Sequence, residues 1–376
     1  MLAVNYTSTL KQISDQIDIL GSDPAISKPS AMANNHSNDL VLITGATGHL
    51  GYATLIEALS RGYNVRAAVR SEAKFNVIAS APSTQPYVSQ LTSVVVPDIT
   101  TPGAFDDAVK DVKYIVHLAS PLILPNAKDF DAEIIQPAIR GTVGILESAT
   151  KSSSVKRVVI TSSSAAVVSA SGEPYTADNV EEDPKGPFEH FFVAYLASKK
   201  LAYSATRRFV AEEKPGFEVS NIMPSFVIGP NKLATTPQEV DSGSNTVALT
   251  SVLGKKNPAG TALFVCHVDD VAFIHIEALE PKYEGSRNWG VNWNGLDREK
   301  SWDSANEIVR KHFPKEVESG LLPANGEHKS VYTPFDASAT EEAMGRKFKD
   351  WETMIVDLVG YYVKVSSGSA KNGASL

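Results

Sequence analysis

A tyrosine and a lysine one helical turn apart are the residues of this chain best suited to proton transfer. Tyr195 and Lys199 lie in a stretch compatible with a helix, which would project both side chains from one face. A phenol, with a free pKa of about 10, transfers protons poorly at neutral pH until a nearby ammonium group stabilises the phenolate. Tyr195 could then protonate a carbonyl oxygen as hydride reaches the carbon. A surface pair with no chemical role would have the same spacing.

A cluster of hydroxyl groups precedes this pair in the sequence. The run Val158–Thr161 predicts a buried strand near residues 156–161, and Ser162, Ser163 and Ser164 follow it directly. In a doubly wound sheet the carboxyl ends of the strands face the ligand crevice. One of these serines, such as Ser163, could therefore hydrogen-bond a substrate oxygen; a turn or a helix cap is the alternative interpretation.

The elements that must position these groups begin with a glycine-rich turn. A strand-like run, Leu40–Thr44, leads into Gly45, Gly48 and Gly51 and then into a helical stretch near residues 50–61. Glycine allows the backbone N–H groups of such a turn to approach a diphosphate closely. The turn therefore predicts a dinucleotide site, although plain packing uses similar turns. The candidate contacts are Gly45, Thr47, Gly48, His49, Leu50 and Gly51.

Arg70 decides which dinucleotide is expected. The second predicted strand, residues 64–69, ends at Arg70, with Lys74 following, where an NAD site would place an Asp or Glu for the ribose hydroxyls. A guanidinium suits a 2′-phosphate, whereas a carboxylate would repel one. We therefore expect NADP(H); the alternative is that Arg70 is an ordinary surface arginine.

Strands and helices alternate over residues 40–230. This alternation predicts an α/β fold with a doubly wound parallel sheet, that is, a Rossmann fold. The expected strands lie near residues 64–69, 93–96, 113–118, 156–161 and 217–223, and the expected helices near 50–61, 129–150 and 190–213.

The two ends of the chain follow different patterns. Residues 1–39 predict a flexible extension with a short amphipathic helix. Residues 231–376 predict a smaller mixed region that caps the carboxyl ends of the strands and ends in a disordered tail from Ser366 onward. Within it we expect a loop over 231–258, a return to the sheet domain over 262–280, and helices near 302–312 and 351–363.

The composition limits the classes of partner. The 376 residues carry a formal net charge of −8, which argues against a nucleic acid or an anionic membrane surface. One cysteine, Cys266, excludes an internal disulfide and a cysteine-rich zinc site, and no apolar run is long enough to span a membrane. Without a visible secretion signal, these features predict a cytoplasmic protein, and we assign no metal ligands.

Together these motifs resemble the extended short-chain dehydrogenases/reductases, and especially the dihydroflavonol-reductase-like branch that includes fungal aldehyde and ketone reductases. The resemblance spans roughly Leu40 to Val363. It implies an NADP-binding Rossmann fold followed by a substrate-binding region. Besides the glycine turn and the Tyr–Lys pair, it rests on the segments 65–70, 97–99, 117–121, 221–224, 229–230 and 267–272.

The same resemblance implies roles for single residues. Ser163 would polarise the carbonyl group, Tyr195 would be the acid, and Lys199 would also hold the nicotinamide ribose. Arg70 and Lys74 would hold the 2′-phosphate. The remaining implied cofactor contacts are Asp98 and Ile99 beside the adenine, Ala119, and Pro224 beside the nicotinamide.

Two departures from relatives narrow the expected substrate. Plant dihydroflavonol reductases have an asparagine five residues after the catalytic serine, where this chain has Val168. Cinnamoyl-CoA reductases have Asn-Trp before the catalytic tyrosine, where this chain has Val193-Ala194. Flavonoids and CoA thioesters are therefore disfavoured. The apolar segments 121–125 and Val167–Val168 predict apolar walls around one polar centre.

We therefore expect NADPH-dependent reduction of an aldehyde or ketone, a small-molecule carbonyl substrate of apolar character, as in the ketoreductases of fungal secondary metabolism. A nucleotide-sugar epimerase or dehydratase is the first alternative, but it would hold NAD tightly and need an acid where Arg70 stands. A non-catalytic NADP sensor is the second, but such proteins usually lack the Tyr–Lys pair.

Overall fold

Seven parallel strands form the centre of the protein. The computed structural model describes residues 36–121, 127–169, 172–293 and 301–373. Neighbouring strands follow the order β11-β7-β5-β4-β1-β2-β3, and every pair is parallel. These strands are β1 (Leu40–Thr44), β2 (Asn64–Val69), β3 (Leu91–Val95), β4 (Tyr114–His117), β5 (Arg157–Thr161), β7 (Glu218–Pro224) and β11 (Asn288–Val291).

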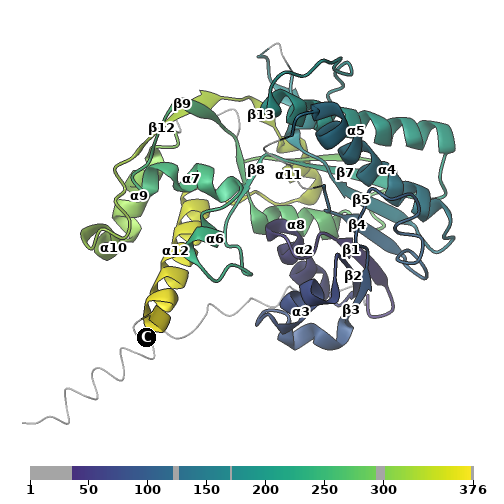
Figure 1. Ribbon diagram of the computed structural model, residues 1–376, viewed down its shortest axis with the longest axis horizontal. Helices are drawn as coiled ribbons and strands as arrows, with labels where there is room; N and C mark the ends of the chain where they lie inside the picture. Colours follow the sequence, from purple (N-terminus) through teal and green to yellow (C-terminus); the bar gives the residue numbers. More distant parts are fainter. Residues whose placement is uncertain (1–35, 122–126, 170–171, 294–300, 374–376) are drawn as a thin grey trace, which may run out of the picture. The chain divides into compact units, whose positions relative to one another are not determined.

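Helices cover both faces of this sheet (Figure 1). One face packs against α2 (His49–Ser60), α3 (Glu72–Ser80) and α8 (Val268–Glu277). The other packs against α4 (Gln136–Thr150) and α5 (Phe191–Glu213). Strands buried on both faces favour near-continuous apolar runs, which explains Leu40–Ile43 in β1 and Val158–Ile160 in β5. The doubly wound Rossmann fold is therefore confirmed.

Most segments after β7, together with a short strand from the connection between β5 and α5, build the capping region above the carboxyl ends of the strands. Its apolar core gathers around Trp302 and Trp351, and it also contains Leu249, Ile355 and Leu358. Its strands pair two by two: β8 (Phe226–Ile228) with β10 (Val265–His267), β9 (Lys256–Leu263) with β12 (Glu327–Tyr332), and β6 (Tyr175–Thr176) with β13 (Phe335–Asp336). Its helices are α6 (Pro237–Val240), α7 (Ser244–Val252), α9 (Ser304–His312), α10 (Pro314–Glu318), α11 (Ser338–Met344) and α12 (Trp351–Gly373).

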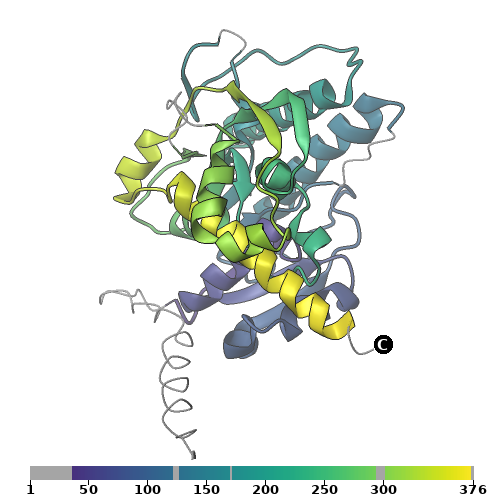
Figure 2. The same cartoon turned by 90° about the vertical axis from the view of Figure 1, so that its left-hand side faces the viewer.

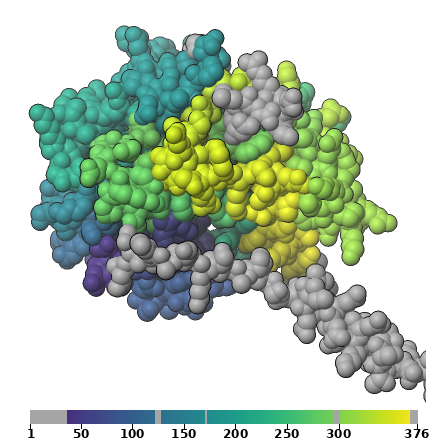
Figure 3. Space-filling view, turned by 180° about the vertical axis from the view of Figure 1, so that it is seen from behind, coloured from purple at the N-terminus to yellow at the C-terminus, as the bar shows by residue number. Residues whose placement is uncertain are grey.

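This region and the sheet pack together in one compact unit that begins at His36. In Figure 3 the yellow surface of the C-terminal segment adjoins the green and yellow-green surfaces of earlier segments. A division into two domains at residue 230 stays a prediction. None of the described helices is both long and apolar enough to cross a membrane.

The sequence suggested that the segment 231–258 is a loop, but in the structure it is not. It forms α6, α7 and the start of β9. Most of its polar residues are not buried, Asn245 and Ser251 excepted, whereas Val240, Leu249 and Val252 are fully buried in the core of the capping region. Apolar residues this sparse show no clear helical period, although Thr236 and Glu239 form a capping box that marks the start of α6.

The return to the sheet also differs from expectation. The run Leu263–Val268, which resembles a returning strand in the sequence, contains β10; this strand pairs with β8 outside the seven-stranded sheet, while α8 packs on the sheet face. The strand that rejoins the sheet is β11, which pairs with β7. Its four residues include an asparagine and a glycine, so its strand pattern is too weak to recognise.

Both ends of the predicted structure shift as well. Helix α12 continues to Gly373, so Ser366–Gly373 is helical and not disordered. A helix that has already formed can add residues at its end without the cost of a new nucleus. At the other end, His36 is 9% exposed and stacks on Tyr63, so ordered structure begins before Leu40. The predicted N-terminal helix and the apolar residues 122–125 lie outside the described residues.

Candidate active site

The glycine turn after β1 leaves no room for a side chain at Gly45 or Gly51. Gly45 has a φ of +73°, and a Cβ there would lie 2.8 Å from the backbone nitrogen of Ala119. A Cβ at Gly51 would overlap the carbonyl group of Gly45. The first turn of α2 follows with no acidic residue and no side-chain cap from Gly48. Its free N–H groups and positive dipole end therefore suit an anion such as a diphosphate.

Two cationic side chains follow the second strand of the sheet. Arg70 follows β2 and Lys74 lies in α3; both are exposed, and neither forms an ion pair with the described part of the chain. Lys74 and Thr47 border a cavity of about 440 Å³. The residue at the end of β2 is Arg70 and not an Asp or Glu. The positive charges of Arg70 and Lys74 therefore fit a ribose that carries a 2′-phosphate better than a ribose with free hydroxyl groups.

The other predicted cofactor contacts also lie at the carboxyl edge of the sheet. Asp98, after β3, accepts hydrogen bonds from the backbone and side chain of Thr100, which lower the pKa of its carboxyl group. Ile99 lies against Gly141 of α4. The backbone N–H of Ala119 donates to Thr44 at the end of β1. Pro224 is the last residue of β7.

The end of β5 and one face of α5 bring the predicted catalytic residues to the same edge. Ser163 caps the short 3₁₀ helix Ser164–Ala166, and its Oγ accepts a hydrogen bond from the N–H of Ala165 at 3.1 Å. This short helix packs against α5. On α5, Nζ of Lys199 lies 5.7 Å from the centre of the Tyr195 ring. The capping interpretation of Ser163 therefore holds, yet its O–H can still donate to a substrate.

A small polar cavity of about 20 Å³ lies behind Lys199, with room for about one water molecule. His117 borders it, and its Nδ1 lies 3.0 Å from Oγ1 of Thr44. Burial, assisted by the charge of Lys199, lowers the pKa of His117 to about 4. His117 is therefore neutral at neutral pH. Its contact with Thr44 links the ends of β4 and β1, and it adds no charge to the site.

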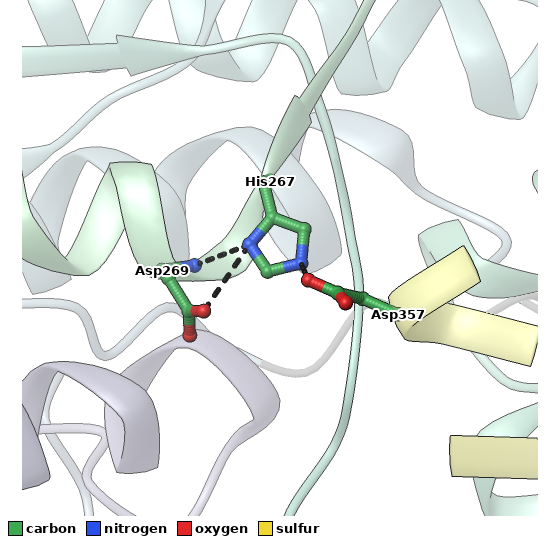
Figure 4. A group of neighbouring side chains, drawn as sticks. All are labelled: His267, Asp269 and Asp357. Atoms are coloured by element: carbon green, nitrogen blue, oxygen red, sulfur yellow. Dashed lines mark hydrogen bonds and ion pairs between the residues drawn. The ribbon is translucent and has the colours of Figure 1, made fainter. Parts of the chain in front are cut away.

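A second group of titratable side chains lies where α8 begins (Figure 4). His267 points between Asp269 and Asp357, at 3.5 Å and 3.4 Å from their carboxylate oxygens. Metal sites use such side chains, but Nζ of Lys349 lies 2.9 Å from an oxygen of each carboxylate. Since this ammonium group already binds an oxygen of both carboxylates, we assign no metal to the group.

The sequence did not indicate the residues across the 440 Å³ cavity from the glycine turn. They belong to the segment read as a loop, and the capping box at its start was the signal that could have placed a helix there. The cavity residues from this segment are Asn231, Leu233, Ala234, Gln238, Glu239 and Ser242.

Comparison with known proteins agrees with this architecture. Residues 41–292 match the NAD dependent epimerase/dehydratase family. The ketoreductase CTB6 of Cercospora nicotianae is 36% identical over 344 residues, covering 88% of this chain and 96% of that protein. The NAD-dependent epimerase/dehydratase ALT6 of Alternaria alternata is 38% identical over 331 residues, or 82% and 94% of the two chains. The crystal structure of Gre2 in complex with NADPH from Candida albicans superposes with a TM-score of 0.71 at 25% identity, covering 87% of this chain and 99% of that chain.

Proposed function

This chain belongs to the NAD dependent epimerase/dehydratase family, and from that premise we propose that it is an NADPH-dependent reductase that converts an aldehyde or ketone to an alcohol. The observation that carries the proposal is the position of Lys199 beside the Tyr195 ring, at the sheet edge that also holds the glycine turn. The names of CTB6, a ketoreductase, and of Gre2, crystallised with NADPH, support carbonyl reduction and the cofactor.

NADPH, when bound, supplies a hydride for the carbonyl carbon. The side chains supply the rest: Ser163 donates its O–H to the carbonyl oxygen and holds it in place, and Tyr195 delivers the proton that completes the alcohol. The ammonium group of Lys199 stabilises the phenolate that Tyr195 then carries. Hydride and proton add across one carbonyl bond, so the products are the alcohol and NADP⁺.

The residues of the glycine turn bind the diphosphate in this proposal. Arg70 and Lys74 bind the 2′-phosphate, because both are cationic, exposed and unpaired among the described residues. Asp98 and Ile99 lie beside the adenine. Ala119 and Pro224 complete the cofactor site at the ends of β4 and β7, and Lys199 also binds the nicotinamide ribose.

An apolar substrate suits the surroundings of Tyr195. Phe192 lies one turn before Tyr195, is 63% exposed, and stacks at 6.5 Å between ring centres. Val193 beside it is also exposed. Val167, in contrast, is fully buried in a core cluster, so of the two valines after Ser163 only the partly buried Val168 is available as a wall. We therefore place the apolar contact surface on the start of α5.

The biological setting belongs to the proposal too. Ketoreductases such as CTB6 are relatives along nearly the whole chain, which supports a role in secondary metabolism. The only cysteine, Cys266, is buried, which suits a reducing compartment such as the cytoplasm. Epimerase or dehydratase activity, the chemistry in the name of ALT6, remains the second candidate; Arg70 at the end of β2 argues against it.

A panel of carbonyl compounds tests the function directly. We expect purified protein to oxidise NADPH with apolar aldehydes or ketones, to form the matching alcohols, and to use NADH poorly. Incubation with nucleotide sugars and NAD⁺ tests the second candidate in parallel. Conversion of a nucleotide sugar without consumption of NADPH, or tight binding of NADPH with no turnover of any carbonyl compound, would contradict carbonyl reduction.

A further inference from the structure

The cavity beside the glycine turn has two walls from distant parts of the chain. The first carries Thr47 and Lys74, from the turn and from α3. The second, the far wall, is the segment 229–242 after β8, which contributes Asn231, Gln238 and Ser242. Its beginning also meets the glycine turn, because His49 in the first turn of α2 faces the backbone of Gly229 and Pro230. The position of the far wall therefore sets the width of the cleft over the cofactor phosphates.

The far wall has little regular structure of its own. Its only helix, α6, has four residues. Gly229 has a φ of +132°, and two hydrogen bonds with the buried amide of Asn245 hold its N–H and C=O. A segment this short, with a backbone conformation that depends on glycine, needs support from neighbouring elements to stay in place.

Helix α12 supports the far wall at a first point near its middle. Figures 1 and 2 show α6 alongside α12, and the two helices are in contact. Oη of Tyr361 donates a hydrogen bond to the carbonyl oxygen of Ala234 at 3.3 Å. This contact fixes the chain just before α6, between the cavity residues Leu233 and Gln238.

A second support acts through His267. This imidazole is fully buried, and a Cβ placed on Gly229 would lie only 2.9 Å from its Nε2 and 2.8 Å from Cγ1 of Val268, so Gly229 packs against the ring and the neighbouring valine. Asp357 of α12 lies 3.4 Å from the same Nε2, while the backbone N–H of Asp269 donates to Nδ1 (Figure 4). Lys349 joins both carboxylates. The backbone N–H of Asp269 thus holds the ring through Nδ1, and Asp357 faces Nε2, the ring atom nearest to Gly229.

We propose that α12 positions the far wall of the cofactor cleft, and that Asp357 and Tyr361 are positioning residues for NADPH binding. Neither residue borders the cavity. The inference rests on the proposed cofactor site. The C-terminal helix α12, which lies more than 300 residues after the glycine turn, would thus affect the affinity for NADPH.

The test is the dissociation constant of NADPH, measured from its fluorescence on binding to the full-length protein. We expect Asp357→Ala to raise it by about three- to tenfold and Tyr361→Phe by about twofold, the range that indirect positioning effects cover. The KM for a ketone at saturating NADPH should stay within about twofold. If Asp357→Ala does not fold, Asp357→Asn and Tyr361→Phe carry the test.

Glu352→Gln is the matched control. Glu352 lies on the same helix, but its carboxylate binds Lys311 and His312 of the capping region, both at 2.7 Å. Unchanged NADPH affinity in the Asp357 and Tyr361 variants would overturn the inference and leave the proposed function intact. An equal loss in Glu352→Gln would overturn it too, since general loosening of α12 would then suffice. A wild-type protein that does not bind NADPH would overturn both.

Discussion

The ammonium group of Lys199 lies 5.7 Å from the centre of the Tyr195 ring, one turn further along α5. We expect Tyr195→Phe to lower kcat at least about 10²-fold, because it removes only the proton that general acid catalysis supplies. The fold and the NADPH dissociation constant should not change. Lys199→Met should lower kcat similarly and also weaken NADPH binding.

Tyr203→Phe is the matched control for this prediction. Tyr203 lies two turns beyond Tyr195 on α5, and its hydroxyl binds the side-chain amide of Asn288 instead of facing a substrate. Its loss should leave kcat within a fewfold of wild type. A Tyr195→Phe enzyme with near-normal kcat would remove Tyr195 from the mechanism.

Arg70→Ala should narrow the preference for NADPH over NADH. The variant loses one charge-assisted contact to the 2′-phosphate, worth about 1.5–3 kcal/mol, or roughly 10- to 150-fold in the NADPH dissociation constant. NADH lacks that phosphate, so its binding is the internal control. Faster wild-type turnover with NADH than with NADPH at low cofactor concentration would show that Arg70 does not select the cofactor.

A homologous series of methyl ketones tests the apolar contact surface at the start of α5. Each added methylene contributes about 0.8 kcal/mol when buried, so kcat/KM should rise by up to about fourfold per carbon until the surface is covered. Phe192→Ala should flatten this rise. Small hydrated dicarbonyls should react more slowly. A kcat/KM that is flat or falls from the shortest ketone onward contradicts an apolar site.

Stability should fall as the pH drops below neutral. Burial lowers the pKa of His275 to about 4, from 6.5. Because the unfolded state binds a proton between these values and the folded state does not, this part of the stability is present above pH 6.5 and is lost on acidification towards pH 4. The loss is on the order of 2 kcal/mol by pH 5 for each such histidine.

His275→Gln isolates this effect. The imidazole lies 2.7 Å from both Oγ1 of Thr161 and the carbonyl oxygen of Val271, and glutamine offers polar atoms that do not titrate. Between pH 7.5 and pH 5 the melting temperature should fall less in the variant than in the wild type. His117 and His267, whose pKa values burial also lowers to about 4, keep part of the dependence. Identical pH profiles would refute the assignment to His275.

Removal of residues 1–35 should leave activity within about twofold, because the tether is polar and interrupted by prolines. Removal of residues 1–38 should in addition lower the unfolding free energy by about 1 kcal/mol. That deletion takes His36, which stacks on Tyr63 at 4.0 Å and lies 3.1 Å from Glu280. Comparison of the two truncations by activity and thermal unfolding checks both statements. An insoluble 36–376 fragment would show that residues 1–35 cover part of the core.

The sequence alone determined the features whose signals are local. The glycine turn, the end of β2 at Arg70 and the four-residue spacing of Tyr195 and Lys199 are each contained in a short segment, and the alternation of strands and helices then admits one sheet architecture. The expected bounds of α2 and α5 differ from the observed ones by a residue. The family and its chemistry followed from these local patterns.

Only the tertiary structure decided what lies opposite the glycine turn. β11 joins the sheet through pairing with β7, which lies more than 60 residues earlier in the chain. The four residues of β11 are too few for a recognisable strand pattern in the sequence. Asp357 meets His267, and Tyr361 meets Ala234, because the cores of the sheet and of the capping region are packed together. Such contacts depend on how the side chains of two buried surfaces pack together, and this packing cannot be read from the periodicity of either segment alone.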